Sequence, residues 1–112
     1  MVEIDKIKIM RIHPDFLQVF WSLKPTQEDL ADYVIDIYSS QSPSLTIDDY
    51  DLVGENLSLD TYYFEDTSVE GLQHGTRTWY YKLKIKHIAS QEFSIYPETG
   101  YSYINDSYPN RN

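Results

Sequence analysis

The stretch TWYYKLKIKHI, residues 78–88, alternates between large apolar side chains and lysines. One set of alternate positions holds Trp79, Tyr81, Leu83 and Ile85, and the other holds Tyr80, Lys82, Lys84 and Lys86. Successive side chains of a β-strand point to opposite faces of its sheet. The pattern therefore predicts a strand with one face in a core and one wet face covered by lysine stems. A register slip of one residue would bury three lysines, so the register is strongly specified.

Lysines that alternate with aromatic residues also occur on surfaces that bind nucleic acid. That function needs positive charge on the neighbouring strands, but the chain has a net charge of −9. Twelve acidic residues and no Lys or Arg occur between Glu28 and Glu70. Such a surface repels phosphate backbones and anionic lipid. We therefore expect no nucleic-acid and no membrane partner, and two interpretations of the acids remain: simple solubility, or a docking face for a basic partner.

Strand patterns recur along the chain at the spacing of a sandwich or barrel. The expected strands cover residues 3–12, 16–25, 32–40, 50–53, 59–69, 78–88 and 92–97. The first should contain a bulge or edge irregularity, because its apolar positions slip between Ile4 and Ile7. In the fifth, Tyr62 and Phe64 are expected to point inward. The one helix candidate is TQEDLADY, where Thr26 is the expected N-cap.

The length of 112 residues suits one domain, predicted as a sandwich over 1–97 followed by an arm or linker over 98–112. The chain has no cysteine, which excludes disulfides and thiolate metal sites. The opening MVEIDKIKIM has no apolar run of signal-peptide length. We expect synthesis in the cytoplasm, with the protein kept there or assembled into a particle.

Three stretches resemble the fibronectin type III family. LQVFWSLKP is similar to that family's second strand, with Trp21 as its core tryptophan. DYVIDIYSSQSPS is similar to the third strand, which a tyrosine opens, here Tyr33. YYFEDTSVEGLQHGTRTWYYKLKI resembles a longer segment of the family, in which a strand is followed by a DTSV-like turn, a leucine and a glycine, and then a strand led by a tyrosine. The resemblance implies an all-β, seven-stranded antiparallel Greek-key β-sandwich of the fibronectin type III or immunoglobulin-like type.

In the family, a leucine and a tyrosine form the tyrosine corner, whose hydroxyl bonds nearby backbone. The resemblance implies Leu72 and Tyr81 for these roles, with Trp79 as the competitor of Tyr81. The expected structural core is Trp21, Tyr33, Ile35, Leu72, Trp79, Tyr81, Leu83 and Ile85.

Short modules of this kind, with DTSV…YYYKV-like strands, occur in neck, tail and capsid proteins of tailed bacteriophages. The resemblance implies a non-enzymatic virion component that contacts other virion or assembly proteins in many copies and needs no cofactor. The alternative is an adhesion module that binds carbohydrate or a cell surface. Sandwich folds host many functions, so this expectation rests on the family context.

Exposed tyrosines provide large rigid contact area at protein interfaces. The tyrosines without an evident inward place, and hence the possible interface, are Tyr50, Tyr101, Tyr103 and Tyr108. The alternative is that they lie along the sandwich surface or in a poorly ordered tail.

Two groups of residues were considered as metal sites. The acidic loop that contains Asp48, Asp49 and Asp51 lacks the flanking helices and the full ligand set of a helix–loop–helix calcium site. We therefore expect a solvated loop. The alternative is a looser calcium site. The histidines His13, His74 and His87 are far apart in sequence, and a zinc site would have to recruit acids. No metal is therefore expected.

Overall fold

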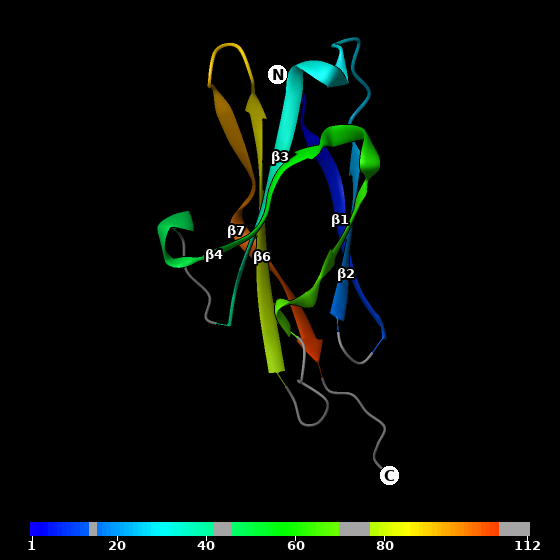
Figure 1. Cartoon of the computed structure of the whole chain (residues 1–112), viewed down its shortest axis with the longest axis vertical. Coiled ribbons are helices and arrows are strands. Elements are labelled where there is room, and N and C mark those ends of the chain that lie inside the picture. Colours follow the sequence, from blue (N-terminus) through cyan, green and yellow to red (C-terminus); the bar gives the residue numbers. More distant parts are fainter. Residues whose placement is uncertain (14–15, 42–45, 70–76, 106–112) are drawn as a thin grey trace.

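The computed structural model describes residues 1–13, 16–41, 46–69 and 77–105. At 11–13, 69, 77–78 and 97–105 only the backbone is described. This part of the chain forms two antiparallel sheets, which confirms the prediction of an all-β sandwich. Figure 1 shows β1 and β2 on one side of the molecule and β3, β6 and β7 on the other.

The three-stranded sheet has the order β1-β2-β5, with strands Ile4–His13, Phe16–Leu23 and Tyr63–Asp66. The four-stranded sheet has the order β4-β3-β6-β7, with strands Asp51–Ser58, Tyr33–Ser40, Arg77–His87 and Phe93–Asn105. Short 3-10 helices connect several strands: η1 Leu30–Asp32, η2 Ile47–Asp49, η3 Leu59–Thr61 and η4 Thr67–Val69.

The strands β1 and β2 form a hairpin whose alternate residues fill the core. Ile7 lies opposite Trp21 and Ile9 opposite Val19, and all four side chains are buried. The register of the β1–β2 pairing shifts between Ile4 and Lys6. This shift confirms the irregularity predicted for the first strand.

The strands β3 and β6 run through the centre of the four-stranded sheet. Ile35 pairs with Ile85, and Ile37 pairs with Leu83. These four side chains are at most 1% exposed. They face the buried residues of β2, so the core lies between the two sheets.

The prediction for the fifth strand is half right. Phe64, in β5, packs against the core. The prediction that Tyr62 points inward is wrong, because this residue precedes β5 at the end of η3 with a φ of 62° and leaves its side chain 41% exposed. The left-handed backbone breaks the alternation of the strand at this position.

The expected helix in residues 26–33 shrinks to the three residues of η1, and its cap differs from the prediction. Asp29, and not Thr26, is the N-cap, and its carboxylate accepts a hydrogen bond from the Ala31 N–H. The Thr26 hydroxyl accepts instead from the Glu28 N–H in the preceding turn. Asp competes well for caps, and a segment this short has no apolar face that would extend the helix.

The boundary predicted at residue 97 falls inside β7. Residues 101–105 continue the pairing with β6, from Tyr101 opposite Tyr81 to Asn105 opposite Arg77. The segment 98–105 therefore belongs to the four-stranded sheet, which corrects its assignment to an arm. Residues 106–112 lie outside the described part. In the described residues, no helix is long and apolar enough to cross a membrane.

Candidate functional site

The three lysines of β6, Lys82, Lys84 and Lys86, lie on the outer face of the four-stranded sheet, but they differ in their exposure to solvent. Lys86 forms an ion pair with Asp36 of β3, with 2.9 Å between Nζ and Oδ2. Its Nζ also donates to Asn56 Oδ1 over 2.9 Å, and the Asn56 N–H donates to Asp36 Oδ1 over 2.8 Å. Asn56 has a φ of 54°, a conformation that asparagine tolerates well. Three strands are thus joined through one buried carboxylate.

Lys82 and Tyr50 correct two sequence predictions together. Lys82 was expected on a wet face but is 1% exposed, and Tyr50 was expected to be exposed at an interface but is 7% exposed. The Lys82 Nζ lies 5.2 Å from the centre of the Tyr50 ring. Tyr50 directly follows η2, and its ring packs against Lys82 on the outer face of β6. Tyr50 and Lys82 therefore shield each other from solvent. Burial lowers the pKa of Lys82.

Next along the same face, Lys84 lies over the ring of Phe93, with its Nζ 4.2 Å from the ring centre. Phe93 is 54% exposed, and Leu52 of β4 is 44% exposed. Burial and the Asp36 carboxylate raise the pKa of Tyr38, which lies between β4 and β6 on this face. The outer face of the four-stranded sheet is therefore a mixed surface of lysines and partly exposed apolar side chains.

The expected core residues within the described part are all buried: Trp21, Tyr33, Ile35, Trp79, Tyr81, Leu83 and Ile85. Leu72 lies outside the described residues. The hydroxyl of Tyr81 donates to Asp66 Oδ2 over 2.6 Å, whereas Trp79 Nε1 has no hydrogen-bond partner in the described part of the chain.

Of the other predicted interface tyrosines, Tyr101 and Tyr103 lie in β7, opposite Tyr81 and Trp79 of β6. The described residues do not include their side chains, and Tyr108 lies outside the described residues altogether. Of the four tyrosines predicted at an interface, only Tyr50 has a described side chain.

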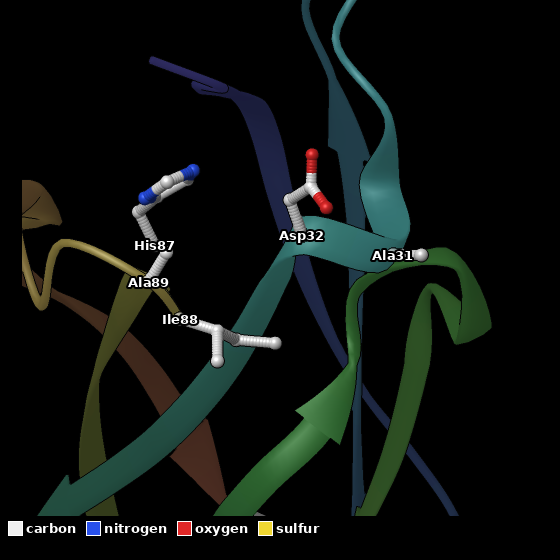
Figure 2. A pocket seen from close by; sticks show the side chains of 5 residues that line it. All are labelled: Ala31, Asp32, His87, Ile88 and Ala89. Atoms are coloured by element: carbon white, nitrogen blue, oxygen red, sulfur yellow. The ribbon is translucent and has the colours of Figure 1, made fainter.

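A pocket of about 400 Å³ lies where η1 meets the end of β6. Figure 2 shows the Asp32 carboxylate and the His87 ring pointing to the same side, with Ile88 beneath them. The His87 ring stacks edge-on against Tyr33, and its Nδ1 accepts a hydrogen bond from the Ser90 N–H. One carboxylate and one imidazole at an open surface can hydrogen-bond a polar side chain of a partner.

Among the described residues, no three His, Cys, Asp or Glu side chains come close enough together to hold a metal ion. This finding covers Asp48, Asp49 and Asp51, whose side chains are described. His87 is placed in the pocket above, whereas the His13 side chain and the whole of His74 lie outside the described part.

The outer face of the three-stranded sheet was missed by the sequence interpretation. Its outward-pointing side chains on β1, β2 and β5 are mainly lysines and aromatic residues, beside Gln18, Ser22 and Glu65. We call this surface the lysine–aromatic face after its members Lys6, Lys8, Met10, Phe16, Phe20 and Tyr63. The missed signal is in FLQVFW, which is apolar at both sets of alternate positions. A strand that is apolar on both faces has a second surface with an apolar character.

In comparisons with known proteins, no family model matches the chain, and neither a curated protein nor a solved structure matches it.

Proposed function

We propose that this chain is a non-enzymatic interaction module of the fibronectin type III or immunoglobulin-like type, and that it serves as a component of a tailed-phage virion. The observation that carries the interaction role is the presence of partly or largely exposed apolar side chains on the outer faces of both sheets. Phe93 and Leu52 are 54% and 44% exposed on one sheet, and the Phe20–Tyr63 pair lies on the other. Exposed apolar surface is the usual mark of a protein–protein contact.

The strand pairings support the family part of the proposal. Strand β2 pairs with β5 in one sheet and β3 pairs with β6 in the other, so each pair joins strands three apart in the chain. Immunoglobulin-like sandwiches with Greek-key connections pair their strands in the same way, through B with E and C with F. The fourth strand, β4, would correspond to the additional strand that joins the C strand in variable-type domains.

The position of Tyr81 supports the same assignment. It lies in the first half of β6, Arg77–His87, and its hydroxyl bonds to a residue upstream in the chain, as in the tyrosine corner. The acceptor here is the Asp66 carboxylate, where the family uses backbone, so this chain would carry a side-chain version of the motif.

The virion part of the proposal rests on the resemblance to phage modules, and it is compatible with a surface that makes several modest contacts. In a symmetric particle many weak contacts act together, so each one need not be strong. The carbohydrate-binding alternative relied on an exposed Tyr50 and an acidic calcium loop. Tyr50 is buried, and no three acids of the described residues are placed to hold a calcium ion, so no specific observation favours that alternative.

The proposal is tested on particles purified from the phage lysate that contains this chain. Quantitative mass spectrometry should detect the chain at a copy number that is a small multiple of the particle's symmetry, and immunogold labelling should place it at one structure. Abundant chain in the lysate with none in the purified particles would reject the virion role.

A further inference from the structure

We propose that the lysine–aromatic face binds a second copy of this chain, through the acidic edge that β4 and η2 form on the opposite sheet. The proposal rests on the proposed function, because it names one partner of the interaction module.

The charge of the lysine–aromatic face comes from β1. Lys6 and Lys8 are both exposed, and neither makes an ion pair with any residue that the structure describes. The acid nearest in register on this face is Glu65, whose carboxylate accepts a hydrogen bond from the Tyr63 hydroxyl. The face therefore carries two lysine charges against one carboxylate, in a chain whose net charge is −9.

The centre of this face is aromatic. Phe20 and Tyr63 lie directly opposite each other in β2 and β5, with ring centres 5.0 Å apart. Lys8 lies opposite Phe20 on the other side, so the charge adjoins the rings. Burial, followed by the hydrogen bond to Glu65, raises the pKa of Tyr63 and keeps its hydroxyl neutral. An aromatic centre with a charged border is the usual composition of a protein interface.

The acidic edge has the complementary composition. Its members are all exposed: Asp48, Asp49, Asp51, Leu52 and Glu55. The four carboxylates lie within four residues of Leu52 in the chain, and Leu52 is itself 44% exposed. Two surfaces with opposite charges around apolar centres attract and orient each other. Charge complementarity thus identifies another copy of the chain as the occupant.

The topology keeps the two surfaces apart on one molecule. The lysine–aromatic face belongs to the outer side of the β1-β2-β5 sheet, whereas the acidic edge starts at β4, the edge strand of the other sheet. A contact between different patches of identical chains is heterologous, so each added copy leaves one free patch of each kind. Such contacts generate rings or filaments, which are the arrangements found where a subunit repeats around an axis.

The test uses the whole chain in two charge-reversed variants, Lys8→Glu and Asp51→Lys. Sedimentation velocity should show concentration-dependent association of the wild type that weakens at least tenfold between about 50 mM and about 500 mM salt, as expected for exposed charges. Each variant alone should associate clearly more weakly than the wild type, because Lys8→Glu reverses the net charge of its face and Asp51→Lys halves the negative charge of its edge. An equimolar mixture of the two variants should associate again, because the unchanged acidic edge of Lys8→Glu meets the unchanged lysine–aromatic face of Asp51→Lys.

Lys24→Glu is the matched control. It makes the same charge change at an exposed site outside both patches, where Lys24 pairs only with Glu3 among the described contacts. It should associate like the wild type, and circular dichroism should show that all variants are folded. A wild type that stays monomeric at about millimolar concentration would overturn the proposal, and so would a mixture of the two variants that stays monomeric.

These outcomes are separable from the virion test. A chain that stays monomeric but occurs in purified particles would overturn self-association and leave the proposed function standing. A chain that self-associates through these patches but is absent from particles would overturn the virion role alone.

Discussion

The Tyr81 hydroxyl donates a 2.6 Å hydrogen bond to Asp66 Oδ2, and both residues are buried, at 0% and 1% exposure. Tyr81 belongs to β6 of the four-stranded sheet and Asp66 ends β5 of the three-stranded sheet. The bond therefore joins the two layers of the sandwich through the core. The second carboxylate oxygen accepts hydrogen bonds from the N–H and the hydroxyl of Ser68, at 2.9 and 2.5 Å, so the carboxylate is well satisfied.

Replacing Tyr81 with Phe should destabilise the protein by about 1.5–3 kcal/mol, because a hydrogen bond to a charged group is lost and a buried carboxylate loses one donor. Urea unfolding followed by tryptophan fluorescence measures the change. Tyr96→Phe is the control, since its hydroxyl donates to the Asp5 carbonyl at the surface and should contribute less than about 1 kcal/mol. Equal losses for the two variants would contradict the proposed importance of the inter-sheet bond.

The Asp36 carboxylate should be sensitive to substitution for a different reason, since it holds Lys86 of β6 and the backbone of β4 at the same time. Asp36→Ala should cost about 2–4 kcal/mol, because it leaves Lys86 partly buried without its counter-charge. Asp36→Asn also removes the counter-charge, but it keeps an acceptor for the Asn56 N–H and should cost less by the contribution of that hydrogen bond, about 1 kcal/mol. Thermal unfolding of both variants gives the comparison, and the same small loss in both would show that the ion pair contributes little.

A methyl group cannot be added at Gly54 without movement. A Cβ there would lie 2.9 Å from Cε1 of Phe64 and 3.2 Å from Cδ1 of Leu57. Gly54→Ala should therefore destabilise the protein by about 1–3 kcal/mol. In a Phe64→Leu background the added methyl group should cost much less, which a double-mutant cycle by urea unfolding measures. Additive effects of the two substitutions would mean that the clash is relieved elsewhere.

Lys82 should make stability depend on pH in the alkaline range. Burial lowers its pKa in the folded protein below the ordinary value of 10.5, which holds for the unfolded chain. Between these two pKa values the unfolded chain binds a proton that the folded protein does not bind, so folding becomes more favourable as pH rises. The free energy of unfolding of the wild type, minus that of Lys82→Met, should therefore increase as the pH rises through the folded pKa toward 10.5.

Lys24 provides a control with the opposite sign. Its hydrogen bond to Glu3 raises the pKa of Lys24, so any stability that this lysine contributes is present below its unfolded pKa and is lost as pH rises through the folded pKa. The difference between wild type and Lys24→Met should be small and should not increase with pH. A Lys82 difference that is flat or falls with pH would contradict the burial effect.

The strand pattern was predictable because alternation is a local property. Neighbouring residues of a strand point to opposite faces whatever surrounds them. The apolar set of residues 79–85 could therefore be assigned to one face from the sequence, and its four members are buried. The same argument failed at Tyr62, where a single left-handed residue breaks the alternation. It also failed after residue 97, where Pro97 and Gly100 hid the continuation of β7.

The surroundings of each face could not be predicted, because they depend on what packs over it. By itself, the sequence determined that this chain forms a two-layered β structure and which side chains of its central strand point inward. The tertiary structure alone decided that Tyr50 covers Lys82, that Tyr81 reaches Asp66 across the core, and that lysines of β1 adjoin aromatic rings of β2 and β5. These relationships join residues that are distant in sequence, and the order of strands in the two sheets brings them together.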